Sequence, residues 1–267
     1  MAKPTEAVMT RFYGLPKIHK PGVPLRSIVS LRGTPTYGLA NGLFQKVRCL
    51  KAGSQTTVHS AEQFLDKIKV ITIEPNERMV SFDVTSLFTS IPRVLAVQTV
   101  RDLLHQHNDE NEGQLTAHYL IDLLEHCLKT SFTFEGITYE QIRGTPIGSP
   151  ICGLIAEIVL QKLERWLFEE DEPKFWARYV DETFVIIDQH RIAYYKERLN
   201  SILPDLHFTL KEGVEGRLPF LDVLVCRQPD GKMATSVYQK STNMLQMLSY
   251  NSNHPMQHNR SCIHMLH

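Results

Sequence analysis

Short apolar runs of β-prone residues predict strands in several parts of the chain. The clearest lie in MVSFDVTSLFTSIP (79–92), where a strand ends at a turn closed by Pro92, and in FWARYVDETFVII (175–187). Residues 11–35 are rich in Pro, Gly and basic side chains, which favours extended strands joined by tight turns. Further strands are expected near 206–211 and within 220–240, where PDG marks a turn.

Apolar residues recur at helical spacing in other segments, and in 61–69 they stand at 61, 64, 65 and 68. The predicted helical segments are 36–69, 94–107, 116–129, 151–169 and 191–202. Between them, residues 131–141 predict a hairpin around Glu135-Gly136. Strands and helices interleave without the regular spacing of a parallel sheet, so an α+β fold is predicted.

Composition limits the class of protein. The chain of 267 residues is 42% hydrophobic and 22% charged, as in ordinary soluble globular proteins. No membrane span is expected, because the most apolar stretch, ICGLIAEIVL (151–160), is short and contains Glu157. The N-terminus lacks the apolar core of a secretory signal. The five cysteines are widely spaced without a CxxC pair, which favours reduced thiols and an intracellular location.

Charge is unevenly distributed, although the net charge is zero. Residues 1–60 contain nine Lys or Arg and one acid, so this segment carries +8 and the remainder −8. A basic segment beside an acidic body is suited to holding phosphates near metal ions, but a solvated charged surface explains the same pattern.

Two adjacent carboxylates interrupt the apolar run at RYVDETF (178–184). Asp181 and Glu182 stand where a two-residue hairpin turn is expected, although Gly or Asn would suit such a turn better. Asp83 similarly follows an apolar strand. If these two strands are antiparallel neighbours, their carboxylates converge at one edge of the sheet. Such oxygen ligands suit Mg²⁺, and a pair of ions would support phosphoryl transfer.

Several long, ordered blocks of the sequence resemble the reverse transcriptase of Penelope-like retroelements. They are YGLPKIHKPGVPLRSIVS (13–30), SFDVTSLFTSIP (81–92), RGTPIGSP (143–150), RYVDETF (178–184) and LPFLDVLV (218–225), with TSVYQKST and SYNSNHP further on. The resemblance implies a right-hand polymerase whose fingers and palm contain an antiparallel sheet packed on helices. It also implies RNA-directed DNA synthesis from a DNA primer on an RNA template, with dNTPs and two Mg²⁺ or Mn²⁺ ions.

The resemblance assigns catalytic roles to four residues. Asp83 and Asp181 match metal-binding carboxylates, and Glu182 stands where a second Asp is usual. Glu keeps the charge but extends it by one methylene group, and reduced activity or none is expected because small misplacements at an active site are costly. Lys211 matches a lysine that protonates the leaving pyrophosphate.

Other roles implied by the resemblance concern the substrates. The residues matched to the incoming nucleotide are Arg26, Lys17, Phe88, Gly148 and Ser149. Arg26 suits bidentate phosphate contacts. Phe88 would exclude a 2′-hydroxyl; the sequence pattern alone favours an apolar core position for Phe88, and the resemblance favours the role beside the sugar. The residues matched to template or primer are Gln141, Arg143, Pro150 and Tyr179.

The resemblance divides the chain into three regions. Residues 1–78 are expected to form a basic, fingers-like region, residues 79–240 a palm with a helical and hairpin insertion at 100–140, and residues 241–267 the start of a truncated thumb. The endonuclease usual in the family is not expected, since no Gly-Ile-Tyr…Tyr-Ile-Gly motif occurs. The family's life cycle implies a nuclear location without an obvious signal here.

Three alternatives remain open at this stage. A catalytically inactive palm remnant would bind template–primer without extending it, and a fold without retained function would do neither. The third alternative is a zinc-binding interaction protein, because four residues near the C-terminus have soft ligands at helical spacing. They are His254, His258, Cys262 and His264.

Overall fold

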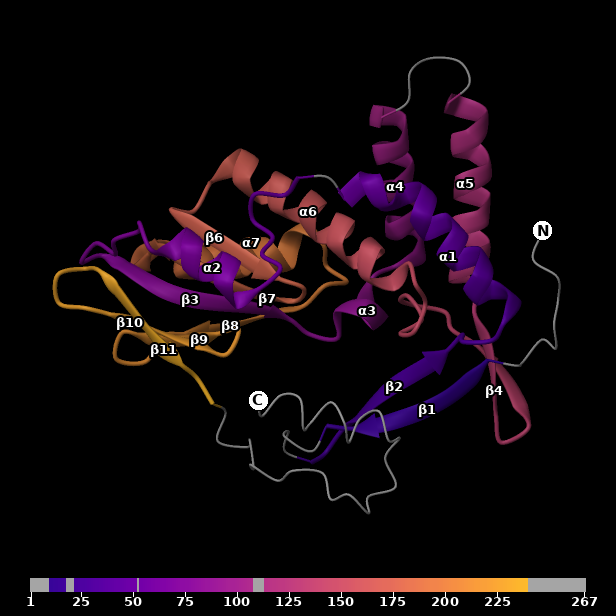
Figure 1. Ribbon diagram of the computed structural model, residues 1–267, viewed down its shortest axis with the longest axis horizontal. Helices are drawn as coiled ribbons and strands as arrows, with labels where there is room; N and C mark the ends of the chain where they lie inside the picture. Colours follow the sequence, from indigo (N-terminus) through magenta and orange to yellow (C-terminus); the bar gives the residue numbers. More distant parts are fainter. Residues whose placement is uncertain (1–9, 18–21, 52, 108–112, 240–267) are drawn as a thin grey trace.

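The strands that carry the predicted carboxylates belong to one four-stranded antiparallel sheet, in the order β6-β7-β3-β8 (Figure 1). The structure is a computed structural model that describes residues 10–17, 22–51, 53–107 and 113–239. The four strands are β3 (Glu77–Val84), β6 (Phe175–Tyr179), β7 (Glu182–Asp188) and β8 (Phe208–Glu212). Segments 79–83 and 176–187 are therefore antiparallel neighbours, which is the condition under which their carboxylates converge.

Alternate residues of a strand point to opposite sides of a sheet, which gives this sheet two faces. One of these faces packs against helices. Val80, Phe82 and Val185 lie on this face, in a core shared with three helices. These are α4 (Arg93–His107), α6 (Cys152–Glu170) and α7 (Ile192–Ile202). Helix α6 is buried over most of its first half, and Figure 1 shows it running along the sheet. The predicted helices near 94–107, 151–169 and 191–202 are thus confirmed.

The opposite face packs against a short helix and a second sheet. Phe184 of β7 packs against Phe64 of α2 (Ala61–Ile68), with ring centroids 5.1 Å apart, and against Phe220 of β9 at 5.9 Å. Burial of each such side chain contributes roughly 1.5–3 kcal/mol. The second sheet has the order β11-β10-β9, formed by β9 (Arg217–Phe220), β10 (Val223–Arg227) and β11 (Met233–Val237).

A third sheet brings together segments that are far apart in sequence. Strands β1 (Arg11–Pro16) and β2 (Leu25–Ser30) form the antiparallel ribbon predicted within 11–35. The predicted hairpin is also present, as β4 (Ser131–Phe134) and β5 (Ile137–Glu140). A parallel pairing of β1 with β4 joins the ribbon to the hairpin, in the order β2-β1-β4-β5.

The predicted continuous helix over 36–69 is wrong. Helix α1 (Pro35–Val47) ends in a 3-10 turn at Arg48–Lys51, and α2 begins only at Ala61. Residues 53–60 between them are not helical because their backbone pairs with β6: Arg178 N–H donates to Thr56 O at 2.8 Å, and Val58 N–H donates to Arg178 O at 2.9 Å. Helix α5 (Gly113–Leu128) accounts for the segment predicted as helix over 116–129.

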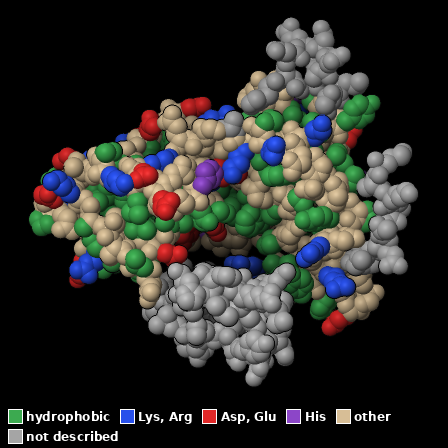
Figure 2. Space-filling view, in the orientation of Figure 1, with side chains coloured by type: hydrophobic (Ala, Val, Ile, Leu, Met, Phe, Trp, Pro, Cys, Tyr) green, Lys and Arg blue, Asp and Glu red, His purple; other side chains and the backbone are tan. Residues whose placement is uncertain are grey.

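The surface shown in Figure 2 is hollowed between the part of the molecule that contains β3 and the part that contains β1 and β2, and acidic and basic side chains are exposed within the hollow. No helix in the described ranges is long and apolar enough to cross a membrane. Cys49, Cys127, Cys152 and Cys226 are free thiols, and Cys262 lies outside the described residues.

Candidate active site

Asp83 and Glu182 are direct partners in the antiparallel pairing of β3 with β7. Directly opposed residues have Cβ atoms about 4.5–5.5 Å apart on the same face of a sheet. Lys211 of β8 reaches this face from the other side of β3, and its Nζ forms an ion pair with Asp83 Oδ2. Ser81 Oγ donates to Asp83 Oδ1 at 3.4 Å. Three strands therefore bring acidic and basic groups together at one end of the sheet.

Asp181 lies in the turn between β6 and β7, and this turn begins one residue earlier than the sequence pattern indicates. Tyr179 pairs with Glu182, so the two turn residues are Val180 and Asp181, and Glu182 is the first residue of β7. The prediction that Asp181 and Glu182 together form the turn is therefore wrong. The reason is that pairing continues as far as Tyr179, which places the left-handed conformation on Val180, at φ 55°.

Two hydrogen bonds to backbone carbonyls hold this turn, one from the backbone of β3 and one from a side chain of β6. Val84 N–H donates to Asp181 O at 3.0 Å, and the guanidinium Nη1 of Arg178 donates to Val180 O at 3.3 Å. A positive φ is unfavourable for a β-branched residue. The conformation of Val180 consequently depends on contacts from outside the turn.

The charges around Asp181 act in opposite directions. Crowding by protein atoms and the negative charge of Asp83 raise the pKa of Asp181, although the residue itself is on the surface. A backbone hydrogen bond and the positive charges of Arg26 and Lys211 lower it. Arg26 is exposed on β2. It thus acts electrostatically on a carboxylate that is 155 residues further along the sequence.

The carboxylates fit the oxygen-ligand chemistry of a divalent cation only in part. Within the described ranges, no three His, Cys, Asp or Glu side chains are close enough together to hold a metal ion. Asp83 and Asp181 are near enough for one charge to alter the pKa of the other. Mg²⁺ commonly uses one or two protein carboxylates and completes its octahedron with water and substrate phosphates. These two residues are therefore the ones that would hold such an ion.

The loop RGTPIGSP is fixed to the short helix α3 (Leu87–Ser90) that follows β3. Phe88 O accepts hydrogen bonds from Thr145 N–H at 2.7 Å and from Thr145 Oγ1 at 3.1 Å. Gly144 has φ 77°, and a Cβ there would lie 2.4 Å from Thr89 Cα. Only glycine allows this approach. Phe88 itself is half-buried and packs against the core beneath the loop.

The same loop contacts β2, the strand that carries Arg26. Val29 N–H donates to Ile147 O at 3.3 Å, and a Cβ on Gly148 would lie 3.0 Å from Val29 O. Gly148 has φ 121°, a backbone angle that residues other than glycine rarely adopt. The loop therefore bridges the strand of Arg26 and the helix of Phe88.

The remaining predicted residues lie at the end of β1, in and before this loop, and at the end of β6. Gln141 Nε2 donates to Arg143 O at 2.9 Å, and Lys17 N–H donates to Pro24 O at 2.9 Å. Ser149 is buried, and its Oγ has no hydrogen-bond partner among the described residues. The other three side chains are exposed or half-buried: Arg143, Pro150 and Tyr179. The four residues of the zinc hypothesis lie outside the described residues.

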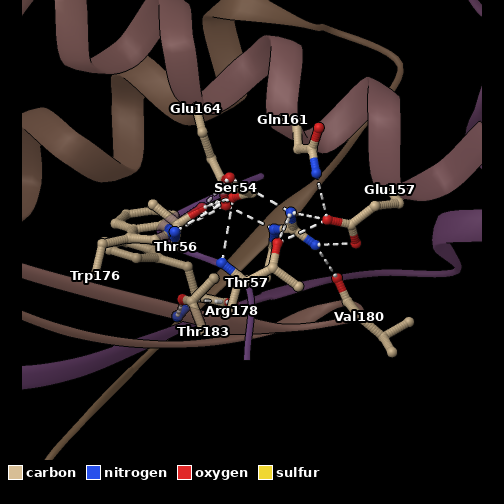
Figure 3. Close-up of polar contacts among 11 residues, drawn as sticks. Ser54, Thr56, Thr57, Glu157, Gln161, Glu164, Trp176, Arg178, Val180 and Thr183 are labelled. Carbon is tan, nitrogen blue, oxygen red and sulfur yellow. Dashed lines mark hydrogen bonds and ion pairs between the residues drawn. The ribbon is translucent and has the colours of Figure 1, made fainter. Parts of the chain in front are cut away.

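A group of buried charges beside the turn was missed at the sequence level (Figure 3). Arg178, next to Tyr179, forms ion pairs with Glu157 and Glu164 of α6. The sequence does contain a signal for it: two acids seven residues apart lie on the same side of the helix as the apolar Leu160 and Leu167, where unpaired charges are costly.

Comparisons with known proteins show the class of fold. No protein-family model and no curated protein matches the sequence. Among solved structures, telomerase from Candida tropicalis is similar with a TM-score of 0.64 at 11% identity over 89% of this chain. Telomerase from Candida albicans in complex with a telomeric RNA fragment has a TM-score of 0.63 at 11% identity. The BmCPV RNA-dependent RNA polymerase at elongation state has 0.51 at 13% identity over 82% of this chain.

These similarities cover only part of the other proteins. The alignments span 50% and 48% of the two telomerase chains and 21% of the viral polymerase chain. At such identities the similarity concerns the fold. The chain has a mixed α+β fold of the kind found in telomerase reverse transcriptases and viral RNA-dependent RNA polymerases.

Proposed function

We propose that this protein is the polymerase portion of a Penelope-like reverse transcriptase, which extends a DNA primer on an RNA template. The observation that carries the proposal is the convergence of Asp83 and Asp181 at one end of an antiparallel sheet, in a polymerase-like fold. Two basic residues, Arg26 and Lys211, act on the same carboxylate pair. Carboxylates with basic groups beside them are the requirement for nucleotidyl transfer, which depends on positioning and charge stabilisation.

In this proposal Asp83 and Asp181 hold two divalent cations, Mg²⁺ or Mn²⁺. The ions supply activation of the primer 3′-hydroxyl and stabilisation of charge on the α-phosphate. Arg26 and Lys17 bind the triphosphate of the dNTP. Phe88 lies under the sugar and excludes a 2′-hydroxyl.

Lys211 has two roles in succession. Without substrate it neutralises Asp83, with which it is paired. In the substrate complex its ammonium group donates a proton to the leaving pyrophosphate. A side chain that is 58% exposed is free to move between these positions, because an exposed ion pair stabilises its geometry by only about 0.2–1 kcal/mol.

The template and primer are recognised mainly through backbone charge and shape, so binding weakens steeply with salt. Gln141, Arg143, Pro150 and Tyr179 contact them. RNA in one of the similar telomerase structures supports an RNA-binding function for this type of fold.

A second candidate is an inactive polymerase fold that binds template–primer without extending it. It is favoured by Glu182, whose carboxylate is one methylene further from the backbone than that of aspartate, and by the absence of a three-ligand cluster among the described residues.

Binding and extension measured on one sample separate the two candidates. Fluorescence anisotropy of a labelled RNA template–DNA primer gives the affinity, and addition of dNTPs with Mg²⁺ or Mn²⁺ gives the extension rate. We expect the wild type to bind and extend, and Asp83→Asn to bind but not extend. Binding without extension by the wild type would support the inactive fold.

A further inference from the structure

Arg178, three residues before Asp181, is a charged residue whose side chain is buried. Arg178 is 2% exposed, and its partners Glu157 and Glu164 are 8% and 5% exposed. Alternation along β6 places Arg178 on the face that packs against α6, opposite the face that carries Asp83. Buried charges cost several kcal/mol each unless their hydrogen bonds are satisfied.

Each of the three guanidinium nitrogens of Arg178 donates at least one hydrogen bond. Nη1 and Nη2 contact the two oxygens of Glu157 at 2.9 and 3.0 Å, and Nε contacts Glu164 Oε1 at 2.6 Å. Nη2 also donates to Thr57 Oγ1 at 3.0 Å (Figure 3). Bidentate contacts of this kind fix orientation as well as charge.

These contacts keep the group ionised. Burial alone would raise the pKa of Glu157, but hydrogen bonds and charge from Arg178, with hydrogen bonds from Thr57 and Gln161, lower it to about 2. Burial acts against the charge of Arg178, whereas Glu164 and Glu157 raise its pKa. At neutral pH the network is therefore a fixed set of charges.

The network ends at the turn that carries Asp181. Arg178 Nη1, which donates to Glu157, also donates to Val180 O. The backbone N–H of Arg178 donates to residue 56, and its backbone carbonyl accepts from residue 58. The network thus joins α6, the segment 53–60 and the turn. Val180 is held in a left-handed conformation that a valine does not adopt without external support.

We propose that Arg178, oriented by Glu157 and Glu164, is a positioning residue for Asp181, acting from the face of the sheet opposite the carboxylates. This inference rests on the proposed polymerase function for its catalytic consequence. Its structural consequence, a fixed turn, is independent of activity. Displacement of a catalytic group by about 1 Å costs around a hundredfold in rate.

Glu157→Gln tests the proposal, because it keeps the shape of the side chain and removes its charge. Glu77→Gln is a matched control. Glu77 is also a largely buried acid paired with a cation, Lys174 Nζ at 2.7 Å, but it lies at the other end of β3 from Asp83. If Glu157→Gln does not fold, Thr57→Val removes one hydroxyl from the network and no charge.

The amide of Val84 reports the position of the turn, since it donates to Asp181 O. We expect hydrogen exchange at Val84 to accelerate about tenfold in Glu157→Gln, or about threefold in Thr57→Val, and to stay unchanged in Glu77→Gln. In primer extension, kcat should fall about tenfold or more with KM for dNTP unchanged.

Unchanged Val84 exchange in the network variants, or equal acceleration in Glu77→Gln, would overturn the proposal. Acceleration at Val84 with a normal kcat would also overturn the catalytic role of the network. A wild type that is protected at Val84 but never extends a primer would refute the proposed function instead, and the exchange result would still decide whether Arg178 holds the turn.

Discussion

Lys211 of β8 forms an ion pair with Asp83 of β3, diagonally across the pairing of the two strands. The pair places an ammonium group at the carboxylate that is proposed to bind a cation. A side chain in this position competes with a cation for Asp83 and neutralises the site when no cation is present. If the proposed function is correct, Lys211 should therefore lower the affinity for the cation and raise turnover.

Replacement of Lys211 by Gln should separate these two effects. Because an exposed ion pair contributes up to about 1 kcal/mol, we expect Mn²⁺ to bind about two- to fivefold more tightly. The single-turnover extension rate should fall about a hundredfold, since the proton donor for pyrophosphate is lost. Mn²⁺ titration followed by electron paramagnetic resonance measures the affinity. Lys232→Gln, which removes a lysine paired with Asp230 in the turn before β11, is the control. Unchanged Mn²⁺ affinity in Lys211→Gln would contradict the competition.

Phe88 should determine the choice between dNTP and rNTP. Phe88→Ala removes the bulk that is proposed to lie under the sugar, and we expect the ratio of kcat/KM for dNTP over rNTP to fall about tenfold or more, a loss of about 1.4 kcal/mol in discrimination. Phe88→Leu keeps most of the bulk and should retain most of the selectivity. If Phe88→Ala only lowers thermal stability and leaves the ratio unchanged, Phe88 is a core residue and has no role in selection.

Gly144→Ala should destabilise the fold more than Gly136→Ala. Both glycines have φ 77°, so both substitutions incur the same backbone strain. At Gly144 the new methyl group would also meet Thr89 Cα at 2.4 Å and Phe88 O at 2.7 Å, whereas nothing lies within 4 Å at Gly136. We expect losses in the free energy of unfolding of about 3 kcal/mol or more at Gly144 and about 1 kcal/mol at Gly136. Urea denaturation measures both, and equal losses would show that the contact with α3 is not required.

Glu157 should make the fold sensitive to acid. Its pKa is lowered from 4.5 to about 2, so its contribution to stability is complete above pH 4.5 and is lost as the pH falls towards 2. A shift of this size corresponds to about 3 kcal/mol. The difference in unfolding free energy between wild type and Glu157→Gln, measured by urea denaturation, should shrink over this interval. A difference that is constant between these pH values would mean that Glu157 is not stabilised as a carboxylate.

Local sequence patterns were sufficient for the elements and for one long-range relationship. The apolar, β-prone runs in MVSFDV and FWARYVDETFVII predict strands that lead to carboxylates, but they do not specify the register of pairing, because both faces of the sheet are buried. The observed register pairs Asp83 with Glu182, as the convergence of the carboxylates requires. Hairpins with strong turn signals, at Glu135-Gly136 and at PDG, also form as predicted.

Features that depend on distant partners were not predictable in the same way. The non-helical segment 53–60 is determined by its pairing with β6, and the turn at Val180 by contacts with Val84 and Arg178. The pairing of β1 with β4 joins Arg11 to Thr133, 122 positions apart, and nothing in either strand specifies it. These features arise from tertiary packing, which overrides local turn and helix preferences.

The most direct test of the polymerase account is primer extension on an RNA template with dNTPs and Mg²⁺ or Mn²⁺, comparing the wild type with Asp181→Asn and Glu182→Asp. The account predicts extension by the wild type, a loss of about a hundredfold or more in Asp181→Asn, and a rate at least equal to that of the wild type in Glu182→Asp. Extension by folded Asp181→Asn at the wild-type rate, or no extension by either folded wild type or Glu182→Asp, would contradict it.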